Sequence, residues 1–143
     1  MLIGEYAHSL DQKGRLIVPA KFRDGLGAEF VLTRGLDGCI TGYSRPAWEA
    51  AEARLKALPL AKKEARFYLR FFYSAAALVA IDKQGRVNIP QTLITFAALK
   101  KDCQIIGMND RIEIWSQERW QALAQEFDDG VEGLAEELLD LGL

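Results

Sequence analysis

Two arginines in this chain occupy the same place in two short polar segments, and their chemistry is that of anion binding. Arg15 follows a glycine in "DQKGRLIVP" (residues 11–19), and Arg86 follows a glycine in "DKQGRVNIP" (residues 82–90). Asp, Gly, Arg and Pro recur in both at identical internal spacing. A guanidinium presents five N–H donors in a planar fork, which suits phosphate oxygens and the edge of guanine. Each arginine is therefore a candidate for binding a phosphate or a guanine.

Further cations accompany the two arginines. Lys13 and Lys83 lie within the same segments, and Lys21 and Arg23 follow a few residues after the first one. An arginine directly after a turn glycine lies at an exposed hairpin tip, where the strands on either side restrict its position. The pattern predicts two basic tips, with Arg15, Arg86, Lys13 and Lys83 as the DNA-binding residues.

The remaining shared residues of the two segments are typical of a tight turn. Gly14 and Gly85 lie where a hairpin requires a positive φ, and Asp11 and Asp82 are placed to accept hydrogen bonds from the turn amides. A simpler interpretation is that each aspartate forms a local ion pair with its arginine and only stabilises the turn. Surface ion pairs of this kind contribute at most about 1 kcal/mol, so the duplication favours a functional role for the arginines.

The duplication extends beyond the two turns. Four further identities lie 72 residues apart, and they are Gly35 with Gly107, Ile40 with Ile112, Ser44 with Ser116, and Trp48 with Trp120. Both copies predict short strands before and after the turn, then a second pair of strands, at residues 29–35 with 39–44 and 103–109 with 111–116. Ser44 and Ser116 are candidate helix N-caps. A further helix is predicted over residues 61–73.

The charge of the chain is unevenly distributed. Residues 121–143 contain seven acidic and no basic side chains, whereas residues 1–120 contain 18 basic and 13 acidic ones. Electrostatic attraction acts over a Debye length of about 10 Å, so a net charge of −2 hides a mildly basic body. Within the acidic, amphipathic segment 126–143, the stretch of residues 131–141 has no obvious core to join in its own chain. It either frays or docks on a neighbour.

Composition argues against an enzyme, a metal site and a membrane protein. The chain has one histidine, His8, and two distant cysteines, Cys39 and Cys103, which favour a structural role over a catalytic triad or a zinc site. We expect neither a cofactor nor a small-molecule substrate. The longest near-continuous apolar stretch is about half of a bilayer span, and no secretion signal is visible. We therefore expect a cytoplasmic protein.

The paired D-x-x-G-R-x-x-x-P segments resemble the SpoVT-AbrB swapped-hairpin element, present twice. The text around them, including "GEYAHSLDQKGRLIVPAKFR", "LPLAKKEARFYLRFFYSA" and "RIEIWSQERW", resembles the bacterial MraZ family over residues 1–125. The resemblance implies an α+β fold of two pseudo-symmetric β-hairpin half-barrels with peripheral helices. We expect the halves at residues 5–47 and 76–119, a helical connector at 48–75, and a C-terminal helix with an acidic tail at 120–143.

The resemblance also implies a function. MraZ proteins are transcriptional regulators that associate with the nucleoid, bind direct repeats in the promoter of the division and cell-wall gene cluster, and assemble into rings. On this chain the family's motif falls at Asp11, Arg15, Asp82 and Arg86, with the arginines expected at DNA. The alternative is an AbrB-like scaffold that acts as a protein-interaction or antitoxin-like module, in which the acidic tail grips a partner.

Overall fold

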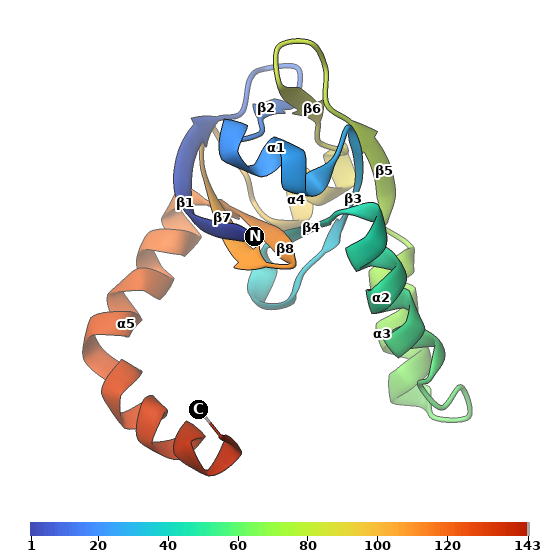
Figure 1. Cartoon of the computed structure of the whole chain (residues 1–143), viewed down its shortest axis with the longest axis vertical. Helices are drawn as coiled ribbons and strands as arrows, with labels where there is room; N and C mark the ends of the chain where they lie inside the picture. The colour runs from blue at the N-terminus through green and yellow to red at the C-terminus, as the bar shows by residue number, and fades with distance from the viewer. Residues whose placement is uncertain (143) are drawn as a thin grey trace.

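The computed structural model describes residues 1–142, which fold into an α+β barrel with two helical arms (Figure 1). This confirms the predicted fold class. The strands are β1 (Leu2–Ser9), β2 (Arg15–Ile17), β3 (Glu29–Arg34), β4 (Ile40–Tyr43), β5 (Ala77–Ala80), β6 (Arg86–Asn88), β7 (Asp102–Asn109) and β8 (Arg111–Ser116). The helices are α1 (Ala20–Leu26), α2 (Arg45–Lys56), α3 (Lys63–Tyr73), α4 (Gln91–Phe96) and α5 (Gln117–Leu138), with single 3₁₀ turns η1 (Leu36–Gly38) and η2 (Leu139–Leu141).

The two copies of the repeat exchange strands. Six strands form one antiparallel sheet in the order β1-β7-β8-β4-β3-β5, and β2 pairs with β6 in a second, two-stranded sheet. Strands β1 to β4 belong to the first copy and β5 to β8 to the second, so the order reads the same from either end once the copies are interchanged. The pseudo-two-fold axis passes between β4 and β8 and through the β2–β6 pair. At that pair, Leu16 lies opposite Val87.

The exchange changes one local expectation. The turn residues alone are typical of a simple hairpin, in which the strand before the turn pairs with the strand after it, whereas the resemblance to the SpoVT-AbrB element implies swapped hairpins. In the structure β1 pairs with β7 along its whole length, while β2 pairs with β6. Only the base of each turn is closed locally, for example by the Asp11 N–H that donates to the Arg15 carbonyl at 2.9 Å. Pairing between the copies is favoured because it buries the apolar strand faces of both copies in one shared core.

That core lies inside the barrel and draws on both copies. Its largest side chains with less than 2% exposure include Phe22, Phe30, Leu16, Leu32, Leu93, Ile40, Ile105 and Ile112. Each tip is followed by a buried strand residue, a proline and a short helix. Pro19 is the N-cap residue of α1 and Pro90 that of α4, because proline cannot extend the strand ladder but suits the start of a helix.

Two helical arms leave the barrel at the end opposite the tips, one on either side (Figure 1). Helices α2 and α3 form one arm, and α5 forms the other. The predicted caps are present, since the Ser44 hydroxyl accepts the Ala47 N–H at 3.3 Å and the Ser116 hydroxyl accepts the Arg119 N–H at 3.2 Å. None of the residues of α5 is buried. Within residues 1–142, the helices lack the combination of length and apolar character needed to span a membrane.

Candidate nucleic-acid interface

The first tip, residues 11–15, is a turn organised around one carboxylate. Asp11 Oδ1 accepts the backbone N–H groups of Lys13 and Arg15, both at 2.9 Å, and Oδ2 accepts Arg15 Nε at 2.6 Å. The Gly14 N–H donates to the Asp11 carbonyl at 3.0 Å. The φ of Gly14 is +78°, which other L-residues adopt only with strain. The aspartate therefore acts as the brace and the glycine permits the turn.

The second tip, residues 82–86, repeats this geometry. Asp82 Oδ1 accepts the N–H groups of Gln84 and Arg86 at 2.9 Å, and Oδ2 accepts Arg86 Nε at 3.0 Å. The φ of Gly85 is +81°. Hydrogen bonds from the backbone N–H of Arg86, followed by its guanidinium, lower the pKa of Asp82, and Arg15 lowers the pKa of Asp11 in the same way. Both carboxylates are therefore charged at neutral pH.

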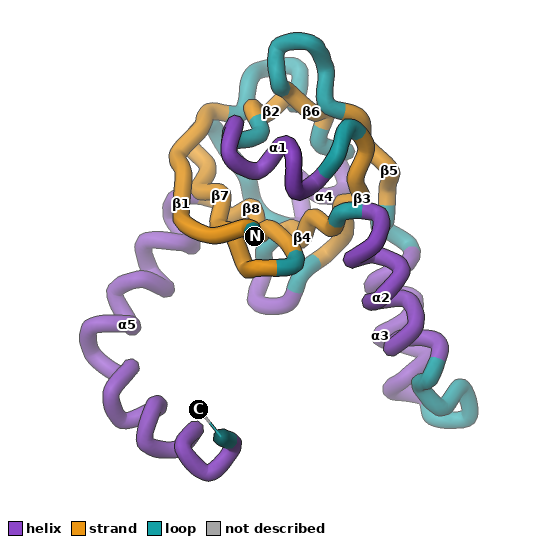
Figure 2. The backbone as a smooth tube through the Cα atoms, in the orientation of Figure 1, coloured by secondary structure: helices purple, strands orange, loops and turns teal. Residues whose placement is uncertain are grey.

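The two tips are tied to each other as well as closed internally. The Gly14 carbonyl accepts the Ile89 N–H, and the Gly85 carbonyl accepts the Val18 N–H, both at 2.8 Å. Each turn is thus fixed by a strand residue of the other copy. In Figures 1 and 2 the two tip loops project side by side above β2 and β6. A single protomer therefore displays two equivalent turns at one end of the barrel.

The structure places every predicted residue of this site on the tips. Lys13 and Lys83 are exposed, and the side chains of Arg15 and Arg86 are 30% and 28% exposed. Each arginine uses Nε for its aspartate, which orients the guanidinium and leaves its Nη groups unpaired with that carboxylate. Arg86 Nη2 also donates to Gln84 Oε1 at 3.3 Å. Such a guanidinium presents a ready pair of donors to an anionic oxygen.

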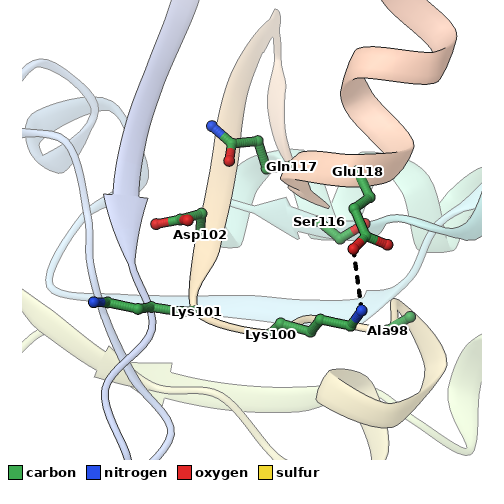
Figure 3. A pocket seen from close by; sticks show the side chains of 7 residues that line it. All are labelled: Ala98, Lys100, Lys101, Asp102, Ser116, Gln117 and Glu118. Carbon is green, nitrogen blue, oxygen red and sulfur yellow. Dashed lines mark hydrogen bonds and ion pairs between the residues drawn. The ribbon is translucent and has the colours of Figure 1, made fainter.

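Residues with catalytic potential lie elsewhere and are poorly suited to react. Burial raises the pKa of the Cys39 thiol to about 12 and that of Cys103 to about 11, so neither forms a thiolate at neutral pH. Within residues 1–142, no group of three or more His, Cys, Asp or Glu side chains is arranged to hold a metal ion. A pocket at the start of α5 contains Lys100 paired with Glu118 at 3.0 Å (Figure 3). Both side chains are about three-quarters exposed, and a pair of this kind contributes little.

The sequence shows Arg23 only as a cation that follows the first turn, and it does not reveal which residues flank each tip. Helices α1 and α4 are seven and six residues long, too short for hydrophobic periodicity to be recognised. They place Arg23 beside the second tip and Ile94 beside the first. Arg23 lies 71 residues before Ile94, so the two occupy corresponding positions with unlike side chains. Because the two copies differ at this position, a search for shared residues passes over it.

Fold and site together define a duplicated swapped-hairpin protein whose two braced, Arg-bearing turns form one surface. The sequence matches the family described as "MraZ protein, putative antitoxin-like" over residues 1–71 and again over residues 72–141. The chain therefore belongs to the MraZ family.

Full-length relatives carry the same designation, "Transcriptional regulator MraZ". The protein of Ligilactobacillus salivarius (strain UCC118) is 54% identical over 143 residues, which is the whole of both chains. The protein of Limosilactobacillus reuteri (strain DSM 20016) is 56% identical over 138 residues, covering 96% of this chain and 97% of the relative. The protein of Lactiplantibacillus plantarum is 54% identical over 140 residues, covering 98% of this chain and 99% of the relative. The family is thus one of transcriptional regulators, which is not an enzyme class.

Proposed function

We propose that this protein regulates transcription by binding repeated promoter DNA through its two Arg-bearing tips. The observation that carries the proposal is the pair of identically braced turns held side by side on the pseudo-two-fold axis. The resemblance to MraZ proteins supports a promoter in the division and cell-wall gene cluster and a protein that associates with the nucleoid in the cytoplasm. Arg15 and Arg86 bind DNA, and Lys13 and Lys83 add sequence-independent attraction to phosphates.

The division of labour within each tip follows from its hydrogen bonds. Asp11 and Asp82 hold the turn and take one edge of the guanidinium, so the free edge meets DNA in a fixed orientation. Fixing a long side chain before binding lowers the entropy lost on association. The aspartate beside each arginine also cancels the net charge of the pair, so binding by one protomer is weak and sensitive to salt.

Several protomers acting together would compensate for weak single tips, and the arms support head-to-tail assembly into a ring. Helix α5 exposes an apolar face that includes Phe127, Val131 and Leu134, each about half exposed, among acidic residues. The α2–α3 arm, residues 45–73, carries seven basic and three acidic side chains and exposes 72% of Phe67. The two faces complement each other in charge and apolar character. The two arms lie on opposite sides of one protomer (Figure 1), so each protomer offers two different surfaces, as a heterologous contact requires.

A ring built this way would carry many tips. Because both arms lie at the end of the barrel away from the tips, assembly through the arms leaves the tips accessible. Once one tip pair has bound, the next repeat is reached at high effective concentration without any new contact. Recognition of repeats then depends on spacing between protomers as well as on the contacts of each tip.

The test is a gel shift at moderate salt with the promoter of the host's division and cell-wall gene cluster. We expect Arg15→Ala and Arg86→Ala each to weaken binding, the double variant to weaken it most, and the oligomer measured by light scattering to persist. Lys100→Ala, which removes an exposed cation paired with Glu118, is the control for loss of charge alone. Unchanged affinity in the double variant would overturn the hairpin-tip mechanism.

The exposed apolar face of α5 favours one alternative, a module that binds a different protein in the manner of an antitoxin. Truncation of residues 126–143 separates the two functions. If the truncated protein loses the oligomer and repeat binding together, α5 serves assembly. If it keeps both but loses a heterologous protein complex, the alternative is correct. Stronger DNA binding after truncation would identify the acidic segment as an electrostatic brake on the tips.

A further inference from the structure

The surroundings of the two tip glycines differ, although the turns themselves match. A Cβ atom added to Gly85 would overlap the guanidinium of Arg23, whereas one added to Gly14 would lie 3.4 Å from Ile94 Cδ1 and 3.5 Å from the Ile89 carbonyl oxygen. Gly85 is accordingly buried and Gly14 only partly buried. A cation thus lies against the second tip at the place where an apolar side chain lies against the first.

Arg23 is held in place by a single bond that leaves most of its donors available. Its Nε donates to the Val18 carbonyl at 3.0 Å, and Val18 in turn donates its N–H to Gly85. Within residues 1–142 no carboxylate oxygen lies within 4.0 Å of the Arg23 guanidinium, and its Nη groups donate no hydrogen bond to the protein. Arg15 and Arg86, by contrast, are both paired with an aspartate.

A guanidinium that has no carboxylate partner keeps its full positive charge, and its free Nη groups can donate to an anion that reaches them. Its charge is felt nearby, since burial and then the positive charge of Arg23 lower the pKa of His8. The residue that Arg23 touches, Gly85, directly precedes Arg86, so two guanidinium groups belong to the same tip. The first tip has a shallow depression at the corresponding position, lined by Lys13, Gly14, Gln91 and Ile94 among others.

We propose that Arg23 is a further DNA-binding residue, whose Nη groups bind a backbone phosphate beside the second tip. Two guanidinium groups, those of Arg23 and Arg86, then serve the second tip, and only Arg15 serves the first. The two tips of one protomer therefore bind DNA unequally, and the second forms more of the phosphate contacts. This inference rests on the proposed function, since it adds a residue to the same surface.

The test uses the salt dependence of binding, because each phosphate contact contributes about 0.9 to the slope of log K against log[salt]. The probe is a fluorescent 40-base-pair duplex of mixed sequence, titrated with full-length protein at several salt concentrations. The slope is negative, and we expect Arg23→Gln to reduce its magnitude by about 1 for each protomer bound through its second tip. The matched control is Ile94→Gln, which makes the corresponding change beside the first tip without removing a charge.

An exchange variant guards against a simple loss of structure. Ile94→Arg alone places a cation beside the first tip and should increase the magnitude of the slope by about 1. The double variant Arg23→Ile with Ile94→Arg should restore the slope of the unmodified protein. If Arg23→Gln keeps the original slope while Arg15→Ala and Arg86→Ala lower it, this inference is wrong and the hairpin-tip mechanism stands. If none of these arginine variants changes the slope, the proposed function itself fails. An unchanged slope in Ile94→Arg also overturns the inference.

Discussion

The two tips agree in everything that holds the turn and differ in what lies against it. In both, one aspartate accepts two backbone N–H groups and an arginine Nε, and the glycine carbonyl accepts an N–H from the other copy. Against Gly85 lies the cation of Arg23, and against Gly14 lies the apolar Ile94. Both copies of the repeat have kept the geometry that presents the arginine. The flanking helices have diverged. The shared turn therefore accounts for the proposed DNA binding by both tips, and the flanking helices account for the proposed difference in how strongly each tip binds.

The largest effect is expected where the two tips share a foundation. Leu16 lies opposite Val87 on the pseudo-two-fold axis, and each is 1% exposed. Leu16→Ala should lower the free energy of unfolding by about 2–5 kcal/mol, measured by urea denaturation, because it leaves a cavity under β2 and β6. It should weaken DNA binding through the two tips equally, since each copy contributes one residue to the pair.

The adjacent residue provides the control for this prediction. Ile17 is 37% exposed and lies on the opposite face of β2, so Ile17→Ala should cost clearly less. Equal losses from the two substitutions would contradict the placement of the axis. If Leu16→Ala impaired the contribution of only one tip to DNA binding, the tips would not share the foundation described above.

A smaller effect is expected at the glycines, where the comparison between the tips is direct. Both φ angles are near +80°, so Gly14→Ala and Gly85→Ala should each lower the free energy of unfolding by about 1–2 kcal/mol. Gly85→Ala must in addition displace Arg23. It should therefore weaken DNA binding more than Gly14→Ala does, in anisotropy titrations of both variants.

Gly130 in α5 offers a matched glycine control, because nothing lies within 4 Å of its Cβ position. Gly130→Ala should raise stability by about 0.5–1 kcal/mol, as alanine favours a helix interior. If Gly14→Ala impaired DNA binding as much as Gly85→Ala, the proposed inequality of the tips would be lost even if the stability changes agreed with expectation.

Local chemistry made the turns and helix ends predictable from the sequence. Glycine at a position that requires positive φ, aspartate able to accept turn amides, and Ser44 and Ser116 as N-caps each act over a few residues. Their geometry therefore depends little on the rest of the chain. The exchange of strands between copies is different, because β1 pairs with β7 across about one hundred residues. A local pattern fixes which face of a strand is apolar but not which strand lies beside it.

The sequence shows Arg23 as a cation that follows the first turn, but its position beside the second tip was missed for a related reason. The duplication drew attention to identities, and Arg23 corresponds to Ile94, which shares neither charge nor size with it. Its position beside Gly85 depends on α1 starting directly after Pro19 and on the tip belonging to the other copy. Only the assembled barrel brings these two segments together.

The smallest effect is a shift in the titration of His8, the only histidine of the chain. Burial, followed by the charge of Arg23, lowers the pKa of His8 below its ordinary value of 6.5. Arg23→Gln removes the second cause and keeps the first, so the pKa of His8 should rise toward 6.5 without reaching it. The ring protons of a single histidine report this without ambiguity in an NMR titration.

The same shift fixes the sign of a pH effect on stability. Above pH 6.5 the imidazole is neutral in the folded and unfolded chain and contributes nothing. Below 6.5 the unfolded chain binds the proton more readily, so stability falls as the pH drops from 6.5 to the lowered folded value. Arg23→Gln should narrow that window, and Ile94→Gln should leave it unchanged. A His8 pKa that does not move in Arg23→Gln would mean that the guanidinium does not lie where the structure places it, within electrostatic reach of His8, and the asymmetry of the two tips would lose its physical basis.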